Sequence, residues 1–184
     1  MLTAVIAIGS LAVALAYESS KTPLPVSAAD QALVLEIEEL RAGFNGRGAP
    51  RGKLEKFGYF DGSWEVTYRF EDDALFLVSN VSREAGERDA RVALRAAWSG
   101  LRVGTELIEG AALVEVEGFE AGDEARLGRI EVEGQPIGSV VAVRIGHCVV
   151  TLVLQGEWFA EPSDAHAALA QSLAAVADVD ALAE

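Results

Sequence analysis

The stretch IGSVVAVRIGHCVVTLVLQ, residues 137–155, decides the fold. Residues 137–145 and 148–155 are apolar at both alternating positions, and Gly146-His147 separates them. Two apolar runs joined by a two-residue turn predict a β-hairpin. Strands that are apolar on both faces are typical of the centre of a sheet that is covered on both sides. Helices elsewhere in the chain must therefore supply that cover.

Neighbouring segments extend this hairpin into a larger sheet. Residues 126–133 (RLGRIEVE) precede it through the turn Gly134-Gln135-Pro136, and residues 112–117 (ALVEVE) form an earlier strand. Residues 64–70 (WEVTYRF) alternate between apolar and polar, and residues 74–81 (ALFLVSNV) follow after an acidic turn. This period of two predicts a second hairpin whose first strand has one buried face.

Three segments have helical periodicity. Ser82 is placed to cap a helix that Gly100 ends. Its apolar stripe comprises Ala90, Ala93, Leu94, Ala97, Trp98 and Leu101. Residues 29–43 predict an amphipathic helix with the stripe Leu33, Ile37, Leu40 and Phe44. Ser163 opens a final helix, whose narrow face of small residues suits close packing on a sheet.

These patterns predict an α+β fold: an N-terminal hydrophobic helix, then a mostly antiparallel sheet of about six strands packed with two or three helices. We expect a membrane anchor or signal segment at residues 1–17 and a linker at 18–28. An amphipathic helix and a basic, glycine-rich loop follow at 29–56, and the α+β domain occupies 57–184.

Residues 1–17 (MLTAVIAIGSLAVALAY) contain no charged side chain. As a helix they would be about 25 Å long, which is short for a membrane span and long for a signal-peptide core. Ala14-Leu15-Ala16 supplies a processing site, but no basic residue precedes the apolar run. A retained anchor, a cleaved signal and a buried helix all stay open. We expect a membrane-anchored protein with its domain on the exported side, periplasmic or extracellular, or a secreted or periplasmic protein after cleavage.

Composition excludes several function classes. The 29 acidic and 15 basic residues give a net charge of −14, which repels a phosphate backbone, so nucleic-acid binding is excluded as the main role. One cysteine, Cys148, cannot form an intramolecular disulfide or a cysteine zinc site.

The residues that catalysis would need are also missing. No G-x-S-x-G motif occurs, and His147 and Cys148 point to opposite faces as strand neighbours. The carboxylates Glu115, Glu117, Glu131 and Glu133 fit a solvated sheet face. We therefore predict a protein that is not an enzyme and has no catalytic, cofactor-binding or metal-binding residues.

Aromatic residues mark two candidate contact surfaces. Phe57, Tyr59 and Phe60 follow the basic loop and precede the first predicted strand, while Trp158 and Phe159 lie just beyond the last one. Core packing does not require these positions, so they are candidates for contact with a protein partner.

The order of hairpin, helix, strand, meander and C-terminal helix over residues 59–179, with the run CVVTLVLQG and the helix from Ser163, resembles the PsbP-like and Ran-binding-Mog-like sandwich. Its members include small bacterial lipoproteins and photosystem extrinsic subunits, and the resemblance implies a non-catalytic binding or assembly role. Lipid anchoring is not implied, because no cysteine precedes Cys148.

The resulting hypothesis is a membrane-anchored, non-enzymatic accessory or assembly subunit whose acidic domain docks on a larger membrane protein complex. The alternative is an exported module that binds a small ligand or lipid in a cavity between the sheet and the helices.

Overall fold

The computed structural model describes residues 21–40 and 52–181. Its helices and strands are, in chain order, β1 (Thr22–Leu24), α2 (Ala28–Gln31), α3 (Ile37–Leu40), β2 (Lys53–Gly58), β3 (Trp64–Glu71), β4 (Phe76–Arg83), α4 (Glu87–Glu106), β5 (Ala111–Val116), β6 (Glu124–Val132), β7 (Gln135–Ile145), β8 (Cys148–Gln155) and α5 (Pro162–Ala181). The predicted N-terminal hydrophobic helix, residues 1–17, lies outside the described residues. No helix within the described ranges is both long enough and apolar enough to cross a membrane.

All eight strands form one antiparallel sheet in the order β1-β2-β3-β4-β8-β7-β6-β5. This confirms the α+β class with an antiparallel sheet. The expected count of about six strands was too low, because β1 and β2 lie where a linker and a loop were predicted. Pro23 and Pro25 disfavour a central strand, but β1 lies at an edge, where a missing N–H group leaves no ladder partner unpaired.

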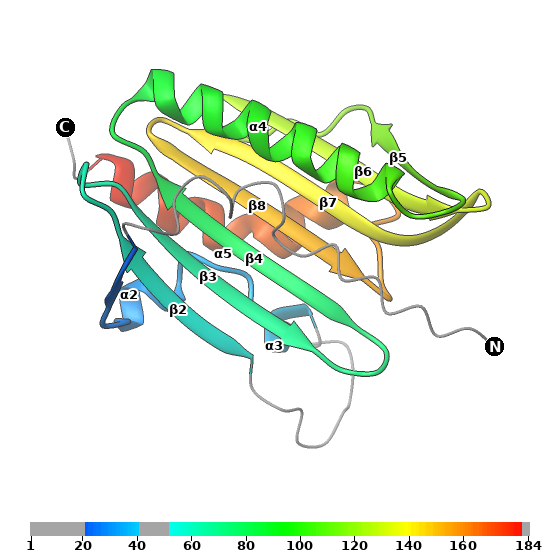
Figure 1. Cartoon of the computed structure of the whole chain (residues 1–184), viewed down its shortest axis with the longest axis horizontal. Helices are drawn as coiled ribbons and strands as arrows, with labels where there is room; N and C mark the ends of the chain where they lie inside the picture. Colours follow the sequence, from blue (N-terminus) through cyan, green and yellow to red (C-terminus); the bar gives the residue numbers. More distant parts are fainter. Residues whose placement is uncertain (1–20, 41–51, 182–184) are drawn as a thin grey trace.

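The two apolar strands β7 and β8 lie inside the sheet (Figure 1). Their side chains belong to two separate hydrophobic cores. One set of alternating residues packs with α4 and comprises Val140, Ala142, Val149 and Val153. The other set packs with α5 and comprises Val141, Val143, Val150, Leu152 and Leu154. The prediction of a strand pair covered on both faces is therefore confirmed, with α4 on one face and α5 on the other.

Helix α4 begins and ends later than the sequence predicted. Ser82 is not its cap: this residue pairs with Val149 in the β4–β8 ladder, and the N-cap is Gly86. Gly100 does not end the helix, which continues to Glu106. The cost of a helical glycine, about 1 kcal/mol relative to alanine, is offset because the buried face continues to Thr105, which is fully buried. The predicted apolar stripe is confirmed, with Ala90, Leu94 and Trp98 buried.

The continuous helix predicted over residues 29–43 was wrong within residues 29–40, where α2 and α3 are single turns with a bend between them. Residues 41–43 and Phe44 lie outside the described residues. Leu33, Val34 and Leu35 are all at most 2% exposed, and one face of a helix cannot bury three consecutive residues. The Leu35 N–H donates to Ser79 Oγ over 2.9 Å and the Ile37 N–H to the Tyr68 hydroxyl over 3.3 Å. This segment covers the part of the sheet face over β3 and β4.

A capping box fixes the start of this segment. Ser27 Oγ accepts from the Asp30 N–H, and Asp30 Oδ2 accepts from the Ser27 N–H over 2.8 Å. Lys56 Nζ donates to Asp30 Oδ1 over 2.6 Å and ties the turn to β2. Burial by itself raises the pKa of Asp30, but the hydrogen bonds from Lys56 and Ser27 and the Lys56 charge outweigh it and hold that pKa below its usual value.

Candidate functional site

The sheet register separates the two aromatic surfaces that the sequence singled out. Gly58 pairs with Trp64, Trp64 with Arg83, and Arg83 with Cys148, so the β2–β3 turn lies at the end of the sheet where β8 begins. The segment after Gln155 leaves β8 at its other end. An eight-residue strand such as β8 is about 26 Å long. The two aromatic groups therefore do not form one surface.

At the far end, only one of the two aromatic residues is accessible. Phe159 is 6% exposed, belongs to the core beneath α5, and its N–H donates to Ser139 Oγ over 2.9 Å. Trp158 is 43% exposed. Because Phe159 is buried in the core, Trp158 is the one residue of this pair that a partner can reach.

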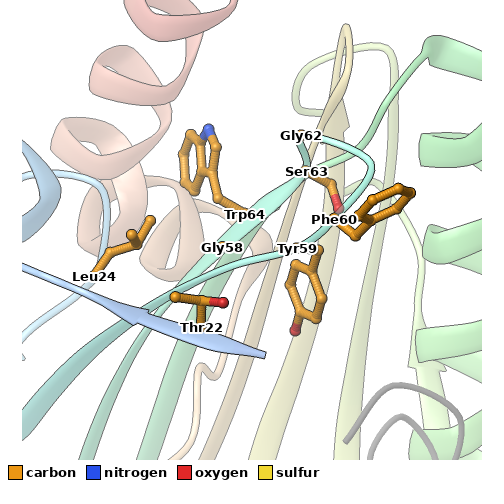
Figure 2. A pocket seen from close by; sticks show the side chains of 8 residues that line it. All are labelled: Thr22, Leu24, Gly58, Tyr59, Phe60, Gly62, Ser63 and Trp64. Atoms are coloured by element: carbon orange, nitrogen blue, oxygen red, sulfur yellow. The ribbon is translucent and has the colours of Figure 1, made fainter. Parts of the chain in front are cut away.

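At the near end, the aromatic residues border a hollow of about 570 Å³. Its lining, which we call the corner hollow, comprises Thr22, Leu24, Gly58, Tyr59, Phe60, Gly62, Ser63 and Trp64 (Figure 2). Figure 2 shows Leu24 and Trp64 on one side of the strands, Tyr59 on the other, and Phe60 at the turn. Phe60 is 99% exposed and Leu24 is 39% exposed.

The β2–β3 turn that carries Phe60 is held by its own hydrogen bonds. The Tyr59 N–H donates to the Ser63 carbonyl over 2.9 Å and the Gly62 N–H to the Tyr59 carbonyl over 3.1 Å. Asp61 accepts from the Ser63 hydroxyl and N–H, and these bonds lower the pKa of its carboxyl. Gly62 has a φ of 84°, which other residues rarely adopt. The turn thus presents Phe60 to solvent without any packing contribution from its side chain.

Charged groups on the opposite side of β2 and β3 hold the start of β1 against the sheet. Lys21 Nζ donates to Glu65 Oε1 over 2.8 Å and lies 5.3 Å from the centre of the Phe57 ring. Burial raises the pKa of Tyr59 far above its usual value, and a hydrogen bond to Glu65 and nearby negative charges add to this. Burial also raises the pKa of Glu84, and the charges of nearby carboxylates raise it further. Phe57 is half-buried and the Lys21 ammonium lies over its ring, which limits the access of a partner to Phe57.

Metal-ligating side chains do not cluster in the described part of the chain. No three His, Cys, Asp or Glu side chains in residues 21–40 and 52–181 come close enough to hold a metal ion. Cys148 is fully buried, and burial raises the pKa of its thiol to about 11. Of the four carboxylates predicted to be solvated, Glu115, Glu117 and Glu133 are exposed and Glu131 is half-buried. Glu115 also pairs with Arg102 and Arg126, and Glu131 pairs with Arg129.

Comparisons with family models, with curated proteins and with solved structures find no match to this chain. The resemblance to the PsbP-like sandwich therefore stays a prediction from the sequence. The geometry of the corner hollow is what carries a functional inference.

Sequence reasoning found Phe60 but missed what surrounds it. Thr22 and Leu24 reach the hollow only because β1 pairs with β2, with Thr22 opposite Gly58 and Leu24 opposite Lys56. The signal available in the sequence was the apolar Leu24 between two prolines in a segment that otherwise resembled a linker.

Proposed function

We propose that this protein is a membrane-anchored, non-enzymatic accessory subunit whose domain docks on the extramembrane surface of a larger membrane protein complex through the corner hollow. The observation that carries the proposal is Phe60, a large apolar side chain that is 99% exposed on a rigid turn beside an apolar hollow. Aromatic side chains that enter a partner's pocket are typical energetic centres of protein interfaces.

Chain length supports a partner in the same membrane. The uncharged segment ends at Tyr17 and β1 begins at Thr22. Five Cα–Cα steps reach at most about 18 Å. Because Thr22 itself lines the hollow, the corner stays within that distance of the end of the anchor. Tethering two proteins in one membrane raises their effective concentration, so a modest contact suffices.

The contact energy is expected to come from few side chains. Burying a phenylalanine side chain contributes about 1.5–3 kcal/mol. Leu24 and the half-buried Trp64 line the same hollow as Phe60 and can contact an apolar group that enters it. The −14 net charge of the chain favours a partner whose surrounding surface is basic or neutral.

The test compares Phe60→Asp with Leu107→Asp in the full-length protein, purified from gently solubilised membranes. Both residues are exposed apolar side chains, 99% and 76%, but Leu107 follows α4, far from the turn. We expect wild type and Leu107→Asp to retain a companion protein at constant stoichiometry, and Phe60→Asp to lose it by about tenfold or more. Equal retention by all three proteins would refute docking through the corner.

The alternative, an exported ligand-binding module, is favoured by the size of the hollow, since ligand pockets measure about 300–1,000 Å³. The space between α4 and the sheet, where the sequence placed its cavity, is instead filled by buried side chains, among them Leu94, Trp98 and Val140. A soluble protein without its first residues, carrying a small apolar molecule that Trp64→Ala releases, would favour this alternative.

A further inference from the structure

The two edges of the sheet differ in how they meet solvent. β1 has three residues and is flanked by Pro25 and interrupted by Pro23, which blunts that edge against further pairing. β5 has six residues, AALVEV, with no proline, no glycine and one charge. Its only sheet neighbour in the described parts of the chain is β6, and Figure 1 shows it at the margin of the sheet. An edge strand without such protection can pair with a further strand through its outward N–H and C=O groups.

The hydrogen-bonding pattern shows which groups of β5 face outward. The Glu133 N–H donates to the Gly110 carbonyl over 3.0 Å, so Gly110 and Glu133 form a hydrogen-bonded pair. Such pairs alternate along an antiparallel ladder. Every second residue after Gly110 therefore bonds to β6, whereas Leu113 and Glu115 direct their N–H and C=O groups away from the sheet. The Ala111 N–H already donates to the Ile108 carbonyl over 3.0 Å and is not available to a partner.

We infer that β5 is the interface through which two copies of this chain pair, antiparallel about a two-fold axis at Val114. In this register Leu113 of one copy lies opposite Glu115 of the other, so all outward groups of both residues are satisfied. Centring the axis on Leu113 instead would place Glu115 opposite Ala111, whose N–H is already engaged. Of these two registers, only the axis at Val114 pairs every outward donor and acceptor of Leu113 and Glu115.

Side chains of β5 agree with a second copy as the occupant. Val114 is 37% exposed and would meet its own copy across the axis. The only charge of the strand, on Glu115, lies 3.6 Å from Arg102 and 3.9 Å from Arg126 of the same chain. The pairing thus does not bring two uncompensated carboxylates together. A self-complementary antiparallel edge also closes after two copies and forms no chain of subunits.

The first test measures, by light scattering, the protein mass of the full-length chain produced alone, without its companion protein, in mild detergent. Val114→Lys places like charges face to face but keeps the backbone groups that pair with β6. Val92→Lys is the matched control, because Val92 is 61% exposed on α4. We expect wild type and Val92→Lys to have twice the 19.4 kDa of one chain, and Val114→Lys to have 19.4 kDa. A monomeric wild type, a dimeric Val114→Lys, or a different protein bound at β5 would each overturn the inference.

A second test remains decisive if Val114→Lys fails to fold. Val114→Cys and Val92→Cys are treated with a short bis-maleimide in native membranes. The one native thiol, Cys148, is buried, so it reacts slowly. We expect a covalent dimer from Val114→Cys and none from Val92→Cys or wild type. Absence of a dimer from Val114→Cys, or equal dimer from both variants, would overturn the inference.

Discussion

Leu35→Ala tests how residues 33–37 are placed. In the structure the Leu35 side chain is fully buried in the core that α5 shares with β3, β4, β7 and β8. In the continuous helix that the sequence suggested, Leu33, Ile37 and Leu40 form the buried stripe. Leu35 would lie about 200° from Leu33 around that helix, on the solvent side. The structure therefore predicts that Leu35→Ala destabilises the protein, whereas the continuous helix predicts almost no change in stability.

The expected magnitude follows from the burial. A buried leucine replaced by alanine costs about 2–5 kcal/mol, through lost transfer energy and the cavity that remains. For a protein of this size about 3 kcal/mol corresponds to a fall in Tm of about 6–12 °C. The assay is urea and thermal unfolding of the full-length protein followed by circular dichroism.

Leu107→Ala is the control for this experiment. Leu107 is 76% exposed, and its replacement is expected to change stability by less than about 0.5 kcal/mol. If Leu35→Ala is as mild as Leu107→Ala, Leu35 is not in the core and the placement of this segment is refuted.

Three further predictions concern single groups. Asp30→Asn is expected to destabilise the protein by about 1–3 kcal/mol at pH 7. The folded pKa of Asp30 lies below its unfolded value, so wild type has this stabilisation above about pH 4 and loses it as the pH falls. The free energies of unfolding of wild type and Asp30→Asn should therefore become equal in acid. The Cys148 thiol, with its pKa raised to about 11, should react with a thiol reagent at pH 8 about a hundredfold more slowly than a free cysteine, and at the ordinary rate once urea unfolds the chain. Glu133 has a φ of 51° in the two-residue turn with Gly134. Glu133→Asn, which suits this turn, should raise the free energy of unfolding measured in urea by about 0.5–1 kcal/mol, and an unchanged or lower value would contradict it.

The centre of the sheet could be predicted from the sequence because its signal is local. Residues 137–145 and 148–155 are mostly apolar on both alternating sides, and this pattern is typical of strands that are covered on both faces. The stripe of α4 was equally local, since Ala90, Leu94 and Trp98 recur at helical spacing. The predicted ends of α4 were wrong because Ser82 resembles a helix cap and Gly100 a helix stop. In the structure Ser82 pairs in the β4–β8 ladder, and the buried face of α4 continues past Gly100 to Thr105.

The conformation of residues 28–40 and the pairing of β1 could not be predicted, because both depend on contacts with residues far away in the sequence. Apolar residues at 33, 37 and 40 fit a helix as well as they fit a segment pressed on a sheet, and the hydrogen bond from the Leu35 N–H to Ser79 decides between them. The same holds for the candidate site. Phe60 could be singled out as an aromatic residue outside the predicted strands, but the hollow beside it exists only once β1 pairs with β2.

The most direct measurement of the central claim is the intact mass of the protein purified natively from gently solubilised membranes, together with the amount of each protein that purifies with it. The account predicts the full 19.4 kDa chain from Met1, in the membrane fraction, with a companion in constant proportion that Phe60→Asp releases. A shorter chain that begins at Tyr17 or Ala29, found alone in the soluble fraction, would contradict it.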